Sequence, residues 1–175
     1  MQKYRSFAFT ARARKLIHKD FGACAAPMNS FLLSEGVETL GLRMERHCFN
    51  AMELARFLNG HDKVAWVNYP GLEENPGFAT AKRLYSNRFG GVLTFGLPDR
   101  ERAFHFINGL HLAKNLANIG DAKTLVIHPA STICSDFGAE EKTLMGVSEE
   151  MVRVSVGIEA IEDIIEDFEH SLENI

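Results

Sequence analysis

The segment from residue 151 to residue 172 constrains the fold more strongly than any other part of this sequence. It begins Met-Val-Arg-Val-Ser-Val, and because side chains alternate across a strand, its three valines share one face while Arg153 and Ser155 lie on the other. Gly157 ends this run, and apolar residues then recur at helical spacing to the end of the segment. The pattern predicts a buried strand from 151 to 156 that leads directly into an amphipathic helix.

Arg153 is the candidate binding residue of this strand, because it places a cation on an otherwise buried element. A guanidinium binds a carboxylate through two parallel hydrogen bonds, which fix both the position and the orientation of the bound group. We therefore interpret Arg153 as an anchor for the carboxylate of an amino-acid substrate. The alternative is an arginine that pairs with a neighbouring acidic side chain at a sheet edge.

A long helix is expected ahead of this segment, from residue 30 to residue 58. Asn59-Gly60 closes it, and Gly36 and Gly41 within it mark places of close packing or a bend. A helix of this length typically connects two bodies of structure. The apolar positions, which recur at spacings of three, four or seven, are Leu33, Val37, Leu40, Met44, Ala51, Leu54 and Leu58.

Helices and strands alternate along the rest of the chain. We expect strands at 64–69, 91–97, 110–113 and 124–127, and helices at 77–85, 98–109 and 158–172. The expected fold class is therefore α/β (α+β), a small sheet covered by helices and packed on the C-terminal helix. The acidic residues near that helix are expected mostly on its solvated face rather than in a metal cluster. They are Glu159, Glu162, Asp163, Glu166, Asp167 and Glu169.

The composition indicates which partners and which cellular compartment suit this chain. A net charge of -4 and a pI near 6.0 argue against a nucleic-acid surface, which requires clustered basic residues. Three widely spaced cysteines, in no C-x-x-C pair, favour a reducing cytoplasm. No apolar stretch is long enough to predict a membrane-spanning helix. The first nineteen residues are basic and lack acids, so a transit peptide is an alternative interpretation of that segment.

Common catalytic motifs do not occur in the sequence, including the nucleophile elbow, the zinc-protease motif and the glycine-rich phosphate loops. His105 and His111 are expected to be packing or surface residues. His128 lies between an apolar strand and Pro129, which imposes an extended backbone on it. We expect a structural role for His128 rather than proton transfer.

Several motifs occur in a defined order along the chain: Gly41–His47 with Asn50-Ala51, Tyr69–Leu72, Phe89–Gly91, Leu125–Ser131 and Val152–Glu159. In order and spacing they resemble the C-terminal part of the Cys/Met-metabolism family of pyridoxal-phosphate enzymes. The run Ala117–Leu125 is similar to the O-acetylhomoserine sulfhydrylase branch of that family. The resemblance covers nearly the whole chain.

This resemblance implies the small C-terminal domain of a fold-type I pyridoxal-phosphate-dependent transferase. Arg153 matches the arginine that binds the substrate α-carboxylate, and Asn118 matches a site-lining position that is often serine. The implied reaction converts O-acetylhomoserine and sulfide to homocysteine, with pyridoxal phosphate as electron sink. The implied partners are an amino-acid substrate and further copies of the chain in a homo-oligomer, whereas the composition argues against nucleic acid and membrane and favours the cytoplasm.

The sequence also departs from the family pattern. The Schiff-base lysine normally follows Ser-x-Thr, and none of the lysines at 3, 15, 19, 63, 82, 114, 123 and 142 has that context. Residues 7–14 resemble a family segment that lies downstream of that lysine. We therefore expect a C-terminal piece of such an enzyme, with residues 1–29 as a connecting segment from the cofactor domain and 30–175 as the substrate-binding domain.

Such a chain is expected to be inactive alone, with no catalytic or cofactor-binding residue of its own. Two alternatives remain open. The first is the same family with a γ-lyase or cystathionine γ-synthase reaction. The second is a non-catalytic binding or assembly module, in which Arg153 captures a carboxylate without any chemistry.

Overall fold

The computed structural model describes residues 6–175. Contacts within the chain divide it into two units, Met1–Leu40 and Gly41–Ile175, which are described separately. The assignment of residues 1–29 as a connecting segment and 30–175 as a substrate-binding domain stays a prediction.

The first unit consists of short helices and one longer one. They are α1 (Ala8–Arg12), the π-helix η2 (Ala13–His18), α2 (Lys19–Phe21) and α3 (Pro27–Glu38). None of these helices buries a residue. Large apolar side chains are instead exposed along them, as in Phe31 and Leu33 of α3. This unit therefore has no apolar core of its own in its described part.

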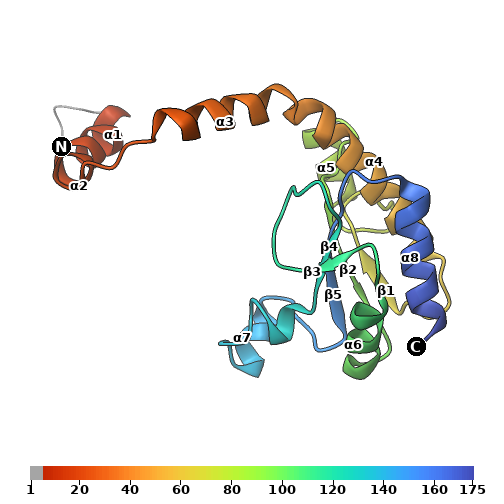
Figure 1. Ribbon diagram of the computed structural model, residues 1–175. Helices are drawn as coiled ribbons and strands as arrows, with labels where there is room; N and C mark the ends of the chain where they lie inside the picture. The colour runs from red at the N-terminus through yellow and green to blue at the C-terminus, as the bar shows by residue number, and fades with distance from the viewer. Residues whose placement is uncertain (1–5) are drawn as a thin grey trace. The chain divides into compact units, whose positions relative to one another are not determined.

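The second unit is built on a five-stranded sheet in the order β1-β2-β5-β4-β3 (Figure 1). Three pairs are antiparallel, and only β3 runs parallel to its neighbour β4. The strands are β1 (Trp66–Asn68), β2 (Val92–Gly96), β3 (Lys114–Asn115), β4 (Leu125–Ile127) and β5 (Met151–Ser155). The α/β class expected from the sequence is confirmed.

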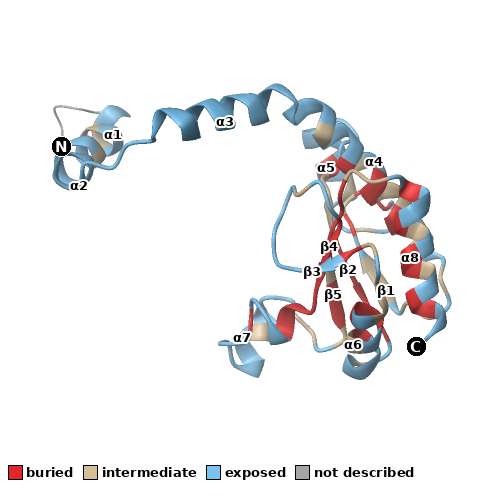
Figure 2. Ribbon diagram, in the orientation of Figure 1, coloured by how far each residue is buried: buried red, intermediate tan, exposed pale blue. Residues whose placement is uncertain are grey.

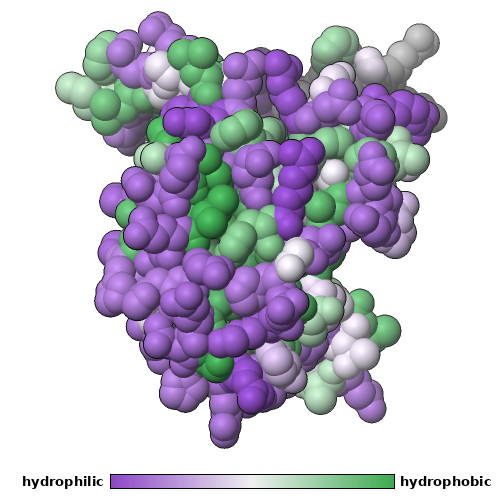
Figure 3. All heavy atoms as spheres, turned by 90° about the vertical axis from the view of Figure 1, so that its right-hand side faces the viewer, coloured by the Kyte–Doolittle hydropathy of each residue, from purple (hydrophilic) through white to green (hydrophobic). Residues whose placement is uncertain are grey.

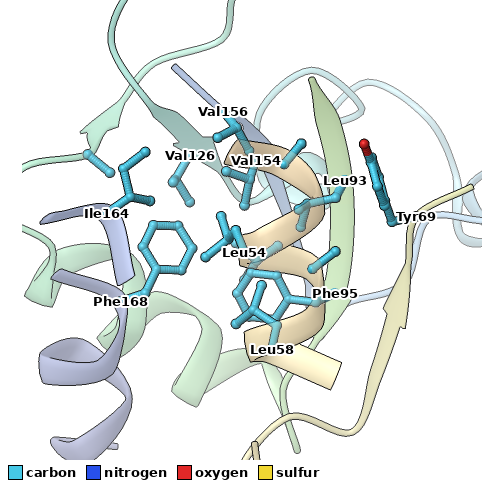
Figure 4. Close-up of a cluster of buried hydrophobic side chains, with 14 of the residues drawn as sticks. Leu54, Leu58, Tyr69, Leu93, Phe95, Val126, Val154, Val156, Ile164 and Phe168 are labelled. Atoms are coloured by element: carbon cyan, nitrogen blue, oxygen red, sulfur yellow. The ribbon is translucent and has the colours of Figure 1, made fainter. Parts of the chain in front are cut away.

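Three helices cover one face of this sheet and form the core with it. They are α4 (Leu40–Asn59), α6 (Arg100–Gly109) and α8 (Ile161–Glu173). Leu54 from α4 and Phe168 from α8 point toward Phe95 and Val154 of the central strands, and all four are buried (Figure 4). The remaining helices are α5 (Phe78–Tyr85), the short 3-10 helix η3 (Pro129–Ser131) and α7 (Ala139–Leu144).

The apolar stripe predicted for the C-terminal helix is confirmed, since Ile161, Ile164, Phe168 and Leu172 are all buried. The helix begins at Ile161, three residues later than predicted. The outward face on the α8 side of the molecule is dominated by hydrophilic residues (Figure 3). This surface agrees with the amphipathic pattern of the sequence.

Two predicted elements differ in the structure. The single helix expected from 30 to 58 is interrupted at Thr39, between α3 and α4. Thr39 lies between Gly36 and Gly41, and all three residues have lower helix propensity than their neighbours. A Cβ added at either glycine would meet no atom within 4 Å, so neither marks close packing.

The strand expected at 110–113 is also wrong, because the strand lies at Lys114–Asn115. Backbone N–H groups of His111, Leu112 and Ala113 all donate to the carboxylate of Asp167. Three successive amides that converge on one anion cannot also form a strand ladder. Asp167 is consequently buried, and it is an exception to the expectation that the acidic residues near this helix lie mostly on its solvated face.

Candidate substrate-carboxylate site

Arg153 lies at the centre of the sheet, on the face opposite the core. In the register of β2, β5 and β4 it stands between Thr94 and Ile127. Its neighbours Val152 and Val154 are fully buried in the core, so strand alternation turns Arg153 to the other side. The predicted strand and its two faces are therefore confirmed.

A row of polar side chains crosses this second face. Asn68 pairs with Thr94, and Thr94 pairs with Arg153, so the three residues occupy one line across β1, β2 and β5. The Thr94 hydroxyl oxygen is buried and has no hydrogen-bond partner in the described part of the chain. The sequence analysis did not single out Thr94. The sequence pattern could have identified it, because Thr94 is a polar residue between the apolar residues Leu93 and Phe95. Arg153 lies between two valines in the same way.

Arg153 as a whole residue is half-buried, and its guanidinium has no acidic partner among residues 6–175. Within residues 6–175, none of the ion pairs involves it. Among these residues, the guanidinium makes one hydrogen bond, from Nη1 to the carbonyl oxygen of Asn118 at 3.5 Å. The alternative interpretation, an arginine neutralised by a neighbouring acid, thus has no counterpart among the described residues. The cation is left with donors that a carboxylate can accept from.

Asn118 is brought to Arg153 by the exposed loop that joins β3 to β4 (Figure 2). Its backbone carbonyl makes the contact, whereas its side-chain oxygen accepts a hydrogen bond from the N–H of Ile119 at 2.9 Å. The structure therefore places the two sequence-predicted residues together. Their roles toward a substrate stay predictions.

The end of β5 is joined to α4 by hydrogen bonds from two buried side chains. His47 contacts the carbonyl oxygen of Val156 through Nδ1 at 2.6 Å. Asn50 donates through Nδ2 to the carbonyl oxygens of Gly157 and Glu159, at 3.0 and 2.9 Å. These contacts connect two motifs that are far apart in the sequence, and they fix the strand that carries Arg153 against α4.

His128 is buried and both of its ring nitrogens are engaged within the fold. Nε2 lies 2.7 Å from the carbonyl oxygen of Glu149, and Nδ1 accepts from the backbone N–H of Ser131. These contacts fit the structural role expected from the sequence. His105 and His111 are exposed, and no group of three or more His, Cys, Asp or Glu in the described part of the chain is arranged to hold a metal ion.

Comparison with known proteins gives the family. The model of the Cys/Met metabolism PLP-dependent enzymes matches residues 5–173. This chain belongs to that family. A homocysteine synthase of Schizosaccharomyces pombe is 48% identical over 171 residues, covering 96% of this chain and 39% of that protein. An O-acetyl-L-homoserine sulfhydrylase of Leptospira meyeri is 46% identical over 172 residues, covering 97% of this chain and 39% of that protein.

A solved structure agrees with this assignment. The crystal structure described as an O-acetylhomoserine (thiol)-lyase of Campylobacter jejuni superposes with a TM-score of 0.90 at 38% identity, over 94% of this chain and 39% of that one. It contains N'-pyridoxyl-lysine-5'-monophosphate, in keeping with a family that depends on pyridoxal phosphate. This chain spans about two fifths of the length of these relatives.

Arg153 offers hydrogen-bond donors that suit a carboxylate, and two of the described lysines, Lys63 and Lys114, are engaged within the fold. Thr94 is paired with Arg153 on the neighbouring strand, and the carbonyl oxygen of Asn118 accepts a hydrogen bond from the guanidinium. Lys63 donates to the carbonyl oxygens that end α8, and Lys114 donates to the carbonyl oxygen of His111. In the described part of the chain, no helix is long and apolar enough to cross a membrane.

Proposed function

We propose that this chain supplies the substrate-carboxylate anchor of a pyridoxal-phosphate-dependent sulfhydrylase that converts O-acetylhomoserine and sulfide to homocysteine. The observation that carries the proposal is Arg153, a half-buried cation on the non-core face of the sheet with no acidic partner in residues 6–175. Its planar group would bind the α-carboxylate through two parallel hydrogen bonds and so fix the orientation of the amino acid.

Asn118 would complete this carboxylate site from the loop side. Its carbonyl oxygen already accepts a hydrogen bond from Nη1 of Arg153, so this contact orients the guanidinium. The other N–H donors of the guanidinium stay available to the substrate. Thr94 lies beside Arg153 on the neighbouring strand and would limit how far the guanidinium can move. Together these groups bind and orient the substrate without any role in bond making.

The cofactor supplies the electron sink for this chemistry when it is bound. We propose that this chain does not hold the cofactor by itself, so that turnover requires the further polypeptide that the longer relatives contain. By itself the chain is expected to show no sulfhydrylase activity. The homo-oligomer, like the cytoplasmic location suggested by the cysteines, belongs to the same proposal.

A hybrid enzyme tests this function. The matching segment of the Leptospira meyeri relative is replaced by this chain, and the hybrid is loaded with pyridoxal phosphate. We expect homocysteine from O-acetylhomoserine and sulfide, and a large loss of activity in the hybrid with Arg153→Ala. The control for assembly is the parent Leptospira meyeri enzyme with alanine at the position that matches Arg153.

The products decide among the reactions of this family. Homocysteine formed only when sulfide is present supports the sulfhydrylase. Release of α-ketobutyrate without sulfide would indicate a γ-lyase, and cystathionine formed from cysteine would indicate a cystathionine γ-synthase. A folded, cofactor-loaded hybrid with none of these activities contradicts the proposal and favours a binding module.

A further inference from the structure

The loop that carries Asn118 is exposed and has few contacts with the core. From Leu116 to Gly120 every residue is exposed, and most of the remainder to Lys123 is exposed as well. A segment of this kind loses substantial conformational entropy when it is held in one arrangement. If the contact between Asn118 and Arg153 is to persist, the two ends of the loop must be fixed by other groups.

Asp167 fixes the start of the loop. One of its carboxylate oxygens accepts from the backbone N–H groups of His111 and Leu112, at 2.7 and 3.1 Å, and the other accepts from Ala113 at 2.9 Å. Asp167 belongs to α8 and is 8% exposed, so these are hydrogen bonds to a charged group shielded from solvent. They hold the chain immediately before β3, from which the loop departs.

Glu159 fixes the end of the loop. Its carboxylate accepts from the backbone N–H of Thr124 at 2.6 Å and from the Thr124 hydroxyl at 3.0 Å. That hydroxyl oxygen in turn accepts from the N–H of Gly157 at 3.0 Å. The N–H of Ile158 also donates to the carbonyl oxygen of Ala122 at 2.9 Å. Both donors of Thr124, its backbone N–H and its hydroxyl, therefore have partners in the segment that follows β5.

Gly157 makes this close approach possible. A Cβ at that position would lie 2.5 Å from the backbone nitrogen of Thr124 and 2.6 Å from the carbonyl oxygen of Ala122, and closer still to the Glu159 carboxylate. Glu159 follows Arg153 by six residues on the same stretch of chain. The strand that presents the guanidinium and Glu159, which clamps the end of the loop through its hydrogen bonds to Thr124, are consequently parts of one continuous segment.

We propose that Glu159 and Asp167 are positioning residues, which fix the Asn118 loop against Arg153 and thereby shape the pocket for the substrate carboxylate. The proposal rests on the function proposed above. Neither carboxylate contacts the substrate. Each acts through the backbone of the loop, one at each end, and the loss of either would let Asn118 move away from the guanidinium.

The first test measures the loop in this chain itself, by hydrogen–deuterium exchange. Glu159→Gln and Asp167→Asn keep the side-chain size but replace an acceptor oxygen with a donor. We expect amide exchange in residues 111–124 to accelerate by about tenfold or more, with α4 still protected. Glu162→Gln and Glu166→Gln, at exposed positions of α8, are the matched controls. Unchanged exchange of the loop in both test variants would overturn the proposal whatever the function is.

The second test measures kinetics in the hybrid enzyme. A displaced loop weakens binding of substrate and transition state alike, so we expect KM for O-acetylhomoserine to rise about tenfold with kcat nearly unchanged. Thr124→Val, which removes the hydroxyl, should likewise raise KM with kcat nearly unchanged. Thr124→Ser, which keeps the hydroxyl, should have the KM of the unmodified hybrid. If Arg153→Ala impairs activity while all of these variants keep a normal KM, the positioning role is wrong and the proposed function stands. If Arg153→Ala is also without effect, the proposed function itself fails.

Discussion

At the scale of single residues, Gly157 is the position where a small change should matter most for stability. Gly157→Ala would force the new methyl group against Thr124 and Ala122, and overpacking of this kind costs about 1–3 kcal/mol. We expect a clear fall in the midpoint of thermal unfolding. Gly41→Ala is the control, because a Cβ there meets no atom within 4 Å and alanine favours a helix by up to about 1 kcal/mol. Equal midpoints for the two variants would show that the Glu159 clamp tolerates a side chain.

Arg153 should matter for activity and little for stability. Charge-assisted hydrogen bonds contribute about 1.5–3 kcal/mol, so Arg153→Ala in the hybrid should lower kcat/KM by roughly ten- to two-hundred-fold or more. Arg153→Lys keeps the charge and loses the two-pronged geometry, and most of the loss should remain. The melting midpoint should stay close to that of the unmodified hybrid, since no ion pair of the described residues is broken. A lowered midpoint with intact kcat/KM would restore the interpretation of Arg153 as a purely structural residue.

At the scale of helices and strands, the sequence predicted those elements whose pattern is set by burial on one face. The strand at Arg153 and the apolar stripe of α8 are of this kind, because alternation and helical spacing are local properties. The segment 110–113 was wrongly predicted as a strand because its hydrogen bonds go to Asp167. That residue is more than fifty positions away, and no local pattern records such a contact. The contact between Arg153 and Asn118 likewise depends on the loop clamps. The resemblance to the family identified both residues as site residues, but it did not predict the contact between them.

The turn after β1 should make the fold sensitive to alkaline pH through Tyr69. This side chain is buried and its hydroxyl donates to the carbonyl oxygen of Gly90, which joins the ends of two elements. Burial, with a smaller effect of the neighbouring Cys48, raises the pKa of Tyr69 well above its usual range. The unfolded chain, with a tyrosine pKa of about 10, therefore releases this proton first. The contribution of Tyr69 to the free energy of unfolding is therefore fully present below about pH 10 and is lost as the pH rises above it.

We expect Tyr69→Phe to reduce this alkaline loss. Urea unfolding at about pH 8 and about pH 11 measures the free energy of unfolding in both chains. The variant should be less stable at the lower pH, by about 1 kcal/mol for the lost hydrogen bond, and should lose less on going to the higher pH. Tyr85→Phe, at an exposed position, controls for tyrosines in general. Parallel pH profiles for Tyr69→Phe and the unmodified chain would contradict this assignment.

At the scale of the whole molecule, exposed apolar surface should make this chain associate with itself. In α3 the side chains of Phe31, Leu32, Leu33 and Val37 are all more than half exposed. Soluble monomers rarely expose large contiguous apolar patches without a partner. Sedimentation velocity over a wide concentration range should therefore show a growing population of larger species. The variant Phe31→Glu with Val37→Glu should sediment more nearly as a monomer, and Leu144→Glu, an exposed residue of α7, is the matched control. A chain that stays monomeric at every concentration, with or without these changes, would show that the apolar surface of α3 does not drive association.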